Sequence, residues 1–569
     1  MDYSIKIGGE AGQGLQTIGH VLCKVFLRGG FHIFAHQDYE SRIRGGHNFY
    51  QLRFSDRPVF SSSERIDLIV ALDRESIERH RSELTENGLV LYDSKSLGIN
   101  HDNPSFLDVP METIAVEKGG NKVMMNTVAV GAVLGMLNFD FSILEFILRE
   151  SFSRKGIEII EGNIRAARDG YDYANKKCLQ CRFNISPMHG PKRMLISGSE
   201  ALALGALAAG CKFISAYPMT PSTEIITYLA RKTKEFGLVV EQAEDEIAAI
   251  NMALGASFTG VRSLTATSGG GFCLMTEGVS LAGMTETPIV IVIGQRPGPS
   301  TGLPTRTEQG ELFFAIHAGH GEFPKAVFSP GTPEDAFYLM QKAFNIAEKY
   351  QCIVFVLSDQ HLADSYWSID GLDFNRIKIE RTLLRDDEVM ENYKRHKITD
   401  SGVSPRAIPG QAKKAVVVTD SDEHDEDGHI IEDAETRKAM VLKRMQKLQG
   451  IASEITMPEL YGTANPDVLL IGWGSAYGAL REAIDLLRME GINASMLHFK
   501  ELWPFPEGIT EIIKSAKKTY TVENNFTGQL RRLIRAETGI ELNGSINKFD
   551  GRPFTSVEII RELRNAFNR

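Results

Sequence analysis

Short apolar strands alternate with helical segments through residues 1–177. The segment YSIKIGG alternates apolar and polar positions as a strand does, and the helix expected after it carries Ile18, Leu22 and Phe26 about one turn apart. The later runs IDLIVALD and GLVLYD are almost entirely apolar, which is typical of strands buried in a parallel sheet. This pattern predicts a first α/β domain over residues 1–177.

The same alternation returns after a linker at residues 178–191. Residues 192–385 are predicted to form a second α/β unit with strands at KFISAY, VVEQ, SLTATS, PIVIVIG and CIVFVLS. Residues 386–462 differ in character, and we expect a connector whose acidic run, TDSDEHDEDGHIIEDAE, is solvated or lies at an interface. Residues 463–569 are predicted to form a last, small α/β unit. The alternation as a whole predicts doubly wound parallel sheets.

Length and composition narrow the class of protein. A chain of 569 residues is too long for one hydrophobic core and should divide into several domains. Its hydrophobic fraction of 43% and charged fraction of 24% are ordinary for a soluble protein, and no apolar run reaches the ~20 residues of a membrane-spanning helix. The net charge of −10 argues against nucleic-acid and anionic-membrane partners. We expect a soluble, cytoplasmic protein with neither kind of partner.

The six cysteines are scattered, which fits a reducing compartment better than a disulfide scaffold. Cys178 and Cys181 form the single C-x-x-C pair of the sequence. A tetrahedral metal site or an iron–sulfur cluster normally needs four ligands, so this pair is expected to be structural or incidental. No metal site is predicted on this chain.

Two elements of the first domain are suited to bind an anion. Glycines follow the first strand at Gly8, Gly9, Gly12 and Gly14, a spacing that differs from the dinucleotide-binding pattern G-x-G-x-x-G. Such glycines let backbone N–H groups approach an anion at a helix N-terminus, but a merely tight turn explains them equally well. Arg42 and Arg44, in ESRIRGGHNF, favour bidentate contacts with phosphate or carboxylate, and a subunit interface is the alternative.

The stretch ISAYPMTPSTEI places Thr220 between two prolines, after an apolar strand and before a helix. Proline restricts its own backbone and that of the residue before it, so Tyr217–Pro221 is predicted to be a stiff, shaped turn. Thr220 then either lies on the floor of a ligand pocket or caps the following helix.

Four acids precede the alanine-rich helix of EDEIAAINMALGASF. Glu241, Glu244 and Asp245 are expected to be a solvated cluster. Glu246 adjoins the alanine-rich face, where a carboxylate is favoured by the helix dipole but is costly to desolvate unless it is paired. We therefore expect a functional role for Glu246.

Two loops are expected at the same edge of the sheet as the turn around Thr220. TSGGGF is predicted to be a flexible loop after one strand, and GQRPGPSTGLPTRTEQGEL to be a long loop after the next. Loops at the C-terminal ends of parallel strands are where ligands bind in such folds.

Several of these motifs together resemble the α subunit of 2-oxoacid:ferredoxin oxidoreductases: AYPMTPSTEI, EDEIAAINMALGASFTGVRSLTATSGGG, GQRPGPSTGLPTRTEQGEL, DEHDEDG and VENNFTGQL. GGEAGQG and RIRGGHNF resemble the γ domain of that family, here fused ahead of α. The resemblance covers nearly the whole chain. It implies a pyrimidine-binding thiamine diphosphate domain over 192–385 and a transketolase C-terminal-like domain over 463–569.

The resemblance also implies the reaction. The family decarboxylates a 2-oxoacid oxidatively with thiamine diphosphate, forms an acyl-CoA from coenzyme A, and passes electrons through iron–sulfur clusters to ferredoxin. The fused domain order is similar to the type that acts on 2-oxoglutarate, so succinyl-CoA is the expected product. Pyruvate, branched-chain and aryl 2-oxoacids are the alternative substrates.

Site residues follow from the resemblance by position. Glu246 matches the glutamate that hydrogen-bonds N1′ of the aminopyrimidine, while Thr220 and Arg306 match residues that contact the substrate. Tyr217 is expected beside the substrate as well. Residues expected to contact the cofactor are Pro218, Ser268, Gly269 and Gly270. Those expected at a coenzyme A site or an interface are Gly12, Gly14, Arg42 and Arg44.

The sequence contains no GDG motif, with which thiamine enzymes hold Mg²⁺ and the diphosphate. The resemblance therefore implies a β subunit that carries the diphosphate, Mg²⁺ and a 4Fe–4S cluster, in a dimer of αβ heterodimers. A non-catalytic scaffold subunit is an alternative, against which the retained Glu246, Thr220 and Arg306 argue. A nicotinamide dehydrogenase is disfavoured by the glycine spacing.

Overall fold

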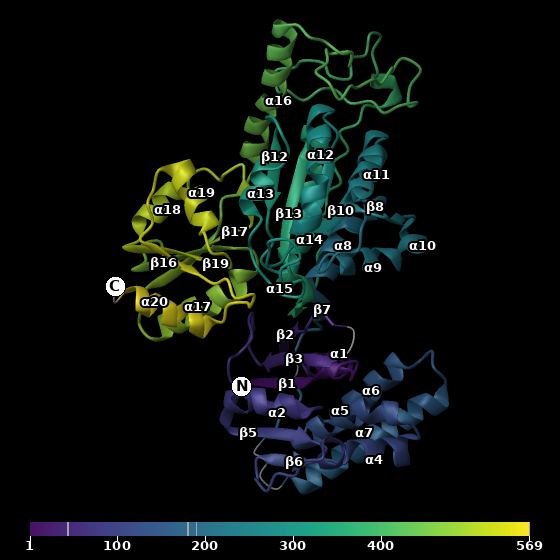
Figure 1. Cartoon of the computed structure of the whole chain (residues 1–569), viewed down its shortest axis with the longest axis vertical. Coiled ribbons are helices and arrows are strands. Elements are labelled where there is room, and N and C mark those ends of the chain that lie inside the picture. The colour runs from purple at the N-terminus through teal and green to yellow at the C-terminus, as the bar shows by residue number, and fades with distance from the viewer. Residues whose placement is uncertain (43–44, 179–180, 182, 189, 568–569) are drawn as a thin grey trace. The chain divides into compact units, whose positions relative to one another are not determined.

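The structure is a computed structural model that describes residues 1–42, 45–178, 181, 183–188 and 190–567. The chain divides into two compact units (Figure 1). The first unit holds residues 1–196 and 365–371, and the second holds residues 197–364 and 372–569.

A mixed sheet forms the centre of the first unit, in the strand order β6-β5-β4-β1-β3-β2-β14-β7. Its strands are β1 Asp2–Ala11, β2 His32–Asp38, β3 Gly45–Ser55, β4 Ile66–Ala71, β5 Leu84–Tyr92, β6 Phe106–Asp108, β7 Met194–Ser197 and β14 Tyr366–Ile369. β1, β4, β5 and β6 are parallel, as predicted, but β3 runs antiparallel to both β1 and β2. The short loop between β2 and β3 explains this difference, because a parallel connection needs a long crossover.

The helices of this unit are α1 Leu15–Arg28, α2 Arg74–His80, α3 Ser94–Leu97, α4 Met111–Ile114, α5 Met125–Met136, α6 Phe141–Ser151 and α7 Ile157–Lys177. Ile18, Leu22 and Phe26 of α1 are buried, which confirms the predicted apolar face. α5 and α7 approach so closely that a side chain at Gly131 or Gly135 would collide with the backbone of α7.

A second sheet organises the other unit, in the order β18-β12-β13-β11-β10-β8-β9. The five predicted strands are confirmed as β8 Phe213–Ala216, β9 Val239–Gln242, β10 Ser263–Ser268, β11 Ile289–Gln295 and β13 Ile353–Asp359. β12 Lys325–Phe328 was not predicted, and β18 Glu501–Trp503 joins from the C-terminal segment, antiparallel to β12. All other pairs in this sheet are parallel.

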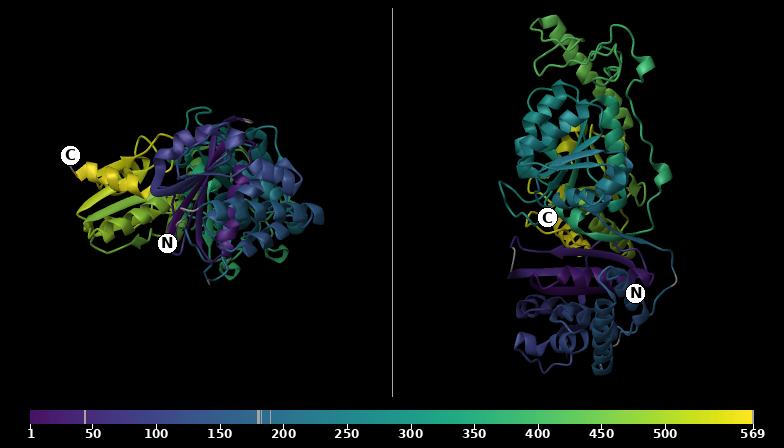
Figure 2. Two further views of the ribbon diagram at one scale, coloured as in Figure 1. Left: turned by 90° about the horizontal axis from the view of Figure 1, so that it is seen from below. Right: turned by 90° about the vertical axis from the view of Figure 1, so that its right-hand side faces the viewer.

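Helices lie on both sides of this sheet (Figure 2). They are α8 Gly198–Ala208, α9 Thr223–Ala230, α10 Thr233–Phe236, α11 Glu246–Phe258, α12 Gly269–Met284, α13 Leu312–His317, α14 Pro333–Tyr350 and α15 Gln360–Asp364. α11 and α12 share a hydrophobic core with Ile289, Ile291 and Ile293 of β11.

The C-terminal segment forms a third sheet, ordered β15-β17-β16-β19-β20. Its strands are β15 Leu460–Tyr461, β16 Val468–Trp473, β17 Ala494–Phe499, β19 Lys518–Glu523 and β20 Gly544–Asn547, with helices α17 Tyr477–Met489, α18 Ile509–Ser515, α19 Gln529–Thr538 and α20 Ser556–Phe567. Trp473 and Leu530 belong to the same hydrophobic cluster as Phe355 of β13, so the two sheets share a core.

The connector is anchored by buried charges. Glu286 forms ion pairs with Lys443 and Lys447 of helix α16, Ala434–Glu454, and its Oε1 lies 3.1 Å from His396 Nδ1. Burial lowers the pKa of Lys443 to about 7, and the two lysines hold the pKa of Glu286 well below its usual range. Part of the acidic run is buried too, since His424 is fully buried against His396. The expectation of a solvated or interface run is therefore wrong for His424.

Cys178 and Cys181, expected to be structural or incidental, are joined by a disulfide. Cys23, Cys211, Cys273 and Cys352 are free thiols. Among the helices of the described residues, none has both the length and the apolar composition needed to cross a membrane.

Candidate functional site

The carboxyl ends of β8, β10 and β11 share one edge of the second sheet, because these strands are parallel. The turn around Thr220 follows β8, helix α12 follows β10, and the long loop follows β11. Arg296, directly after β11, donates a hydrogen bond from Nη1 to the backbone oxygen of Thr220 over 2.8 Å. The predicted convergence of the turn and this loop is confirmed.

The turn around Thr220 does not cap the next helix through that residue. Ser222 is the N-cap of α9, and its hydroxyl donates to the backbone oxygen of Met219 over 2.7 Å. Pro221 is buried against Gly294 of β11, where an added Cβ would lie 2.9 Å from Pro221 Cγ. The interpretation of Thr220 as a helix cap is therefore wrong.

Glu246 begins α11 and is only 3% exposed. Its Oε1 is enclosed and has no hydrogen-bond partner within the described part of the chain. Burial raises the pKa of the Glu246 carboxyl, and the neighbouring charge of Asp245 adds to the effect. Asp245 itself accepts a hydrogen bond from the backbone N–H of Ala248 over 2.8 Å. Glu241 and Glu244 are exposed, as expected for a solvated cluster.

The glycines after β10 form the first turn of α12, so the prediction of a flexible loop is wrong. A side chain at Gly271 would collide with the Glu246 carboxylate, and one at Gly269 would collide with the Glu311 carboxylate. Gly270 is exposed. Ser268 is fully buried, and its Oγ has no hydrogen-bond partner among the residues described. Glycine is needed at 269 and 271 because two acids approach this helical turn.

Glu311 is a site residue that the sequence interpretation missed. Its backbone N–H donates to Gln295 Oε1 over 3.2 Å, while the enclosed Oε2 has no hydrogen-bond partner in the described structure. Burial raises the pKa of this carboxyl to about 8; the charge of Glu308 raises it further and that of Arg296 lowers it. The local sequence, TEQGEL, has no apolar periodicity that would have indicated an acid with an enclosed oxygen.

Arg296 is the arginine that contacts the turn around Thr220. Arg306 is half-buried and packs against Gly551, where an added Cβ would lie 3.1 Å from Arg306 Cβ. The next residue, Thr307, donates its backbone N–H to the Gly551 oxygen over 3.3 Å. Tyr217 and Pro218 belong to the turn itself, and the Tyr217 side chain is 39% exposed.

The C-terminal segment holds the long loop in place. Gln309 donates from Nε2 to the Trp473 oxygen over 2.8 Å and exchanges backbone and side-chain hydrogen bonds with Asn524. Gln529 donates to the Gly310 oxygen over 2.7 Å and accepts from the Phe313 N–H over 3.0 Å. The motifs TEQGEL and VENNFTGQL are therefore hydrogen-bonded to each other.

The first unit contains a cavity of about 350 Å³ lined by Gly12, Gly14 and Arg42. Gly14 is the N-cap of α1 with φ 83°, and no side chain of the described residues caps this helix. Arg42 forms an exposed ion pair with Glu40 at 3.0 Å. Gly8 and Gly9 lie within β1 and outside the turn. Arg44 lies outside the described residues.

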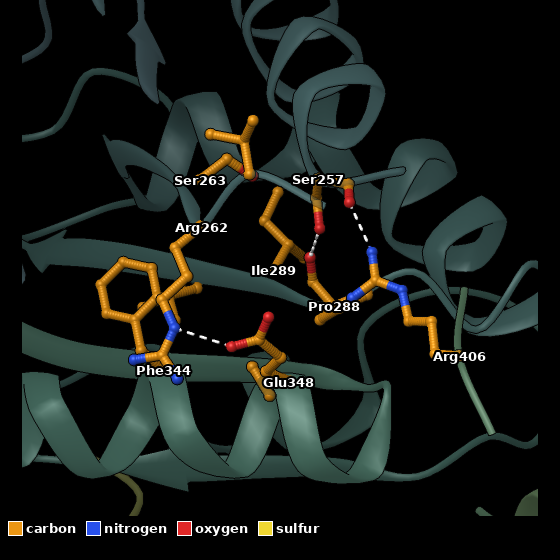
Figure 3. Close-up of a pocket in the computed structure, with 11 residues that line it drawn as sticks. Ser257, Arg262, Ser263, Pro288, Ile289, Phe344, Glu348 and Arg406 are labelled. Atoms are coloured by element: carbon orange, nitrogen blue, oxygen red, sulfur yellow. Dashed lines mark hydrogen bonds and ion pairs between the residues drawn. The ribbon is translucent and has the colours of Figure 1, made fainter. Parts of the chain in front are cut away.

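A smaller pocket of the second unit is interior packing (Figure 3). Its volume is about 10 Å³, room for a single water. Arg262 pairs with Glu348 at 2.8 Å, and Arg406 donates to the Ser257 oxygen over 2.5 Å. The polar groups that line this pocket therefore already have hydrogen-bond partners within the protein. In the part of the chain that the structure describes, no three His, Cys, Asp or Glu side chains are grouped so that they could hold a metal ion.

Three sequence families match successive parts of the chain. Residues 4–173 match the family described as pyruvate ferredoxin/flavodoxin oxidoreductase. Residues 204–443 match the thiamine-diphosphate-binding family of pyruvate flavodoxin/ferredoxin oxidoreductases, and residues 466–559 match pyruvate:ferredoxin oxidoreductase core domain II.

Named relatives match over nearly the full length. The 2-oxoacid:ferredoxin oxidoreductase subunit alpha of Sulfolobus sp is 34% identical, over 99% of this chain and 96% of that protein. The 2-oxoglutarate oxidoreductase subunit KorA of Mycobacterium tuberculosis is 30% identical, over 99% and 91% respectively. The solved 2-oxoglutarate:ferredoxin oxidoreductase from Magnetococcus marinus, with 2-oxoglutarate, coenzyme A and succinyl-CoA bound, is 33% identical, with a TM-score of 0.92 and 99% of both chains covered.

Proposed function

Because the chain belongs to the 2-oxoacid:ferredoxin oxidoreductase family, as an alpha subunit, we propose that it acts with a β subunit to convert 2-oxoglutarate and coenzyme A to succinyl-CoA. Carbon dioxide leaves, and two electrons pass to ferredoxin. The observation that carries this proposal is the enclosed Glu246 carboxylate at the start of α11, beside the first turn of α12.

An aminopyrimidine ring fits the chemistry at Glu246. The enclosed Oε1 needs a hydrogen-bond partner, and a ring nitrogen supplies one. Burial raises the pKa of this carboxyl, which brings it closer to that of a ring nitrogen and allows the proton to be shared. Ser268, Gly269 and Gly270 lie at the same helical turn, and Pro218 lies in the neighbouring turn. Thiamine diphosphate, when bound, supplies the carbon nucleophile and the electron sink of the reaction.

Two arginines of the long loop suit a substrate with two carboxylates. Arg296 lies at the turn around Thr220, and Arg306 lies further along the loop. Guanidinium groups bind carboxylates in bidentate fashion, so 2-oxoglutarate matches this pair better than pyruvate does. In this proposal Thr220 donates its hydroxyl to the substrate, and Tyr217 borders the pocket.

Coenzyme A is assigned to the cavity of the first unit. Gly12 and Gly14 leave backbone N–H groups accessible at the start of α1, which favours a phosphate. Arg42 lines the same cavity, and Arg44 is close to it in sequence. A subunit interface is the alternative for these arginines.

The remaining cofactor groups are assigned to the β subunit. The diphosphate, Mg²⁺ and a 4Fe–4S cluster need ligands that the GDG motif and grouped cysteines would provide, and the sequence has neither. We place the complex in the cytoplasm as a dimer of αβ heterodimers, without nucleic-acid or membrane partners.

The decisive experiment is CoA-dependent reduction of ferredoxin or a viologen dye by the purified complex, across a panel of 2-oxoacids. The expected result is the highest kcat/KM with 2-oxoglutarate. Preference for pyruvate, a branched-chain or an aryl 2-oxoacid would change the substrate but keep the reaction. A properly assembled complex that is inactive with every 2-oxoacid would point to a scaffold subunit and contradict the proposal.

A further inference from the structure

Glu311 carries an oxygen atom that no contact in the described structure explains. Its Oε2 is enclosed, and the same carboxyl group lies against Gly269 so closely that a Cβ there would collide with it. Buried polar groups are nearly always hydrogen-bonded, because an unpaired one loses its hydration without a replacement. The unpaired oxygen of Glu311 therefore calls for a partner from outside the described part of the chain.

The charges around Glu311 allow it to exist in both protonation states. Glu308, on the same loop, repels a negative charge, and desolvation favours the neutral acid, so the pKa lies at about 8. Arg296, on the same loop, and the N-terminal end of the 16-residue helix α12 both stabilise a negative charge. Glu311 is thus a protonated acid at neutral pH with groups nearby that can support its ionised form.

Glu311 lies beside the same turn of α12 as Glu246. The charge of Arg296 lowers the pKa of the Glu311 carboxyl, and the same arginine donates to the Thr220 oxygen in the turn assigned to the substrate. On the same turn of α12, Gly271 lies against Glu246 as Gly269 lies against Glu311. The two carboxyls therefore flank one helical turn.

We propose that Glu311 is a second acid–base residue of this site, which gives its proton to the carbonyl oxygen of the 2-oxoacid when the carbonyl carbon is attacked. The O–H bond of Glu311 breaks, an O–H bond forms on the substrate oxygen, and the electron pair stays on Glu311 beside Arg296. When the carbonyl is formed again on oxidation, the oxygen returns the proton to Glu311, so the step is balanced over one turnover. This inference rests on the proposed function.

Substitution of Glu311 by glutamine distinguishes proton transfer from a purely structural role. Glutamine has nearly the same shape and keeps a hydrogen-bond donor, but it cannot release a proton. Glu311→Gln therefore separates proton transfer from packing and from simple hydrogen bonding. Glu311→Asp keeps the acid on a shorter side chain, and Glu308→Gln removes only the repelling neighbour.

The first measurement uses the purified chain and does not depend on activity. Infrared difference spectra between wild type and Glu311→Gln should contain a carboxylic acid C=O band at pH 7 that disappears as the pH rises through about 8. In Glu308→Gln the same band should disappear at lower pH. The lack of any such band at pH 7 would overturn the proposal, whatever the activity of the complex.

The second measurement uses the complex with its β subunit. Glu311→Gln should lower kcat/KM by about 10²–10⁴-fold, the usual contribution of a positioned acid–base group. Wild type should lose activity above about pH 8, Glu311→Gln should lack this dependence, and Glu311→Asp should recover part of the rate. Unchanged kcat/KM in a folded Glu311→Gln complex would refute proton transfer. Inactivity of the wild-type complex with every 2-oxoacid would instead refute the proposed function, and the infrared band separates the two failures.

Discussion

Gln309 and Asn524 are joined by reciprocal hydrogen bonds across the second unit. The backbone N–H of Gln309 donates to the Asn524 oxygen over 2.7 Å, and the backbone N–H of Asn524 donates to Gln309 Oε1 over 2.9 Å. Both residues are almost completely buried. This pair connects the loop that carries Arg296, Arg306 and Glu311 to the C-terminal sheet, so that sheet takes part in building the site.

Gln309→Ala should therefore destabilise the chain. It leaves the Trp473 oxygen and the Asn524 N–H buried without their partner, at a cost of about 1–3 kcal/mol in the free energy of unfolding. Urea denaturation of the purified chain measures this change. Lys234→Ala, at an exposed position, is the control and should be neutral. Equal stability of both variants would contradict the role assigned to this pair.

Glu246→Gln should remove activity without unfolding the protein. The amide cannot share a proton with a ring nitrogen, so turnover of the complex should fall by about 10²–10⁴-fold. Glu244→Gln, two residues earlier and exposed, is the matched control and should retain activity. Near-normal turnover by Glu246→Gln would move the proposed role to Glu244 or Glu241.

Thr220→Val tests the substrate contact. Valine keeps the shape and removes the hydroxyl, so kcat/KM should fall by about 10- to 150-fold, equivalent to ~1.5–3 kcal/mol for a hydrogen bond to a charged group. The melting temperature should hardly change, because Ser222, and not Thr220, is the N-cap of α9. A variant that melts early but turns over normally would contradict the contact.

Glu286→Ala should be the most destabilising of these changes. It leaves the buried Lys443 and Lys447 without their shared carboxylate, and breaking a buried ion pair costs about 3–5 kcal/mol. Thermal or urea unfolding provides the measurement. The exposed pair Lys232–Glu235 supplies a control, since Glu235→Ala should change stability by less than about 1 kcal/mol.

The Glu311 carboxyl should leave a signature in the pH dependence of stability. Its pKa is about 8 in the folded chain and near 4.5 when unfolded, so the folded state binds more protons between these values. The free energy of unfolding of wild type relative to Glu311→Gln should therefore fall as the pH rises from about 4.5 to 8, by at most about 1.4 kcal/mol per pH unit. A difference that is constant or increases with pH would show that Glu311 is ionised in the folded protein.

Local physical rules in the sequence determined much of the fold. Apolar runs located the five strands of the second sheet that were predicted, and the spacing of Ile18, Leu22 and Phe26 identified the buried face of α1. Two prolines around Thr220 indicated the turn that the structure contains. The alanine-rich helix after Glu246 distinguished this acid from the exposed Glu241 and Glu244. Each conclusion depends on residues close together in the chain, where periodicity and backbone restriction act directly.

Only the tertiary structure decided the rest of the site. The Oε2 atom of Glu311 is enclosed in a loop that is held by Asn524, more than two hundred residues away in sequence, and no local pattern reports that contact. Glycine is required at 269 and 271 because two carboxyls from other segments approach this helical turn. The same limit explains why the hydrogen bond from Arg296 to the Thr220 oxygen was not predicted. Side chains from segments that are distant in sequence come into contact only when the sheets pack together. Hydrophobic periodicity within one segment carries no information about such contacts.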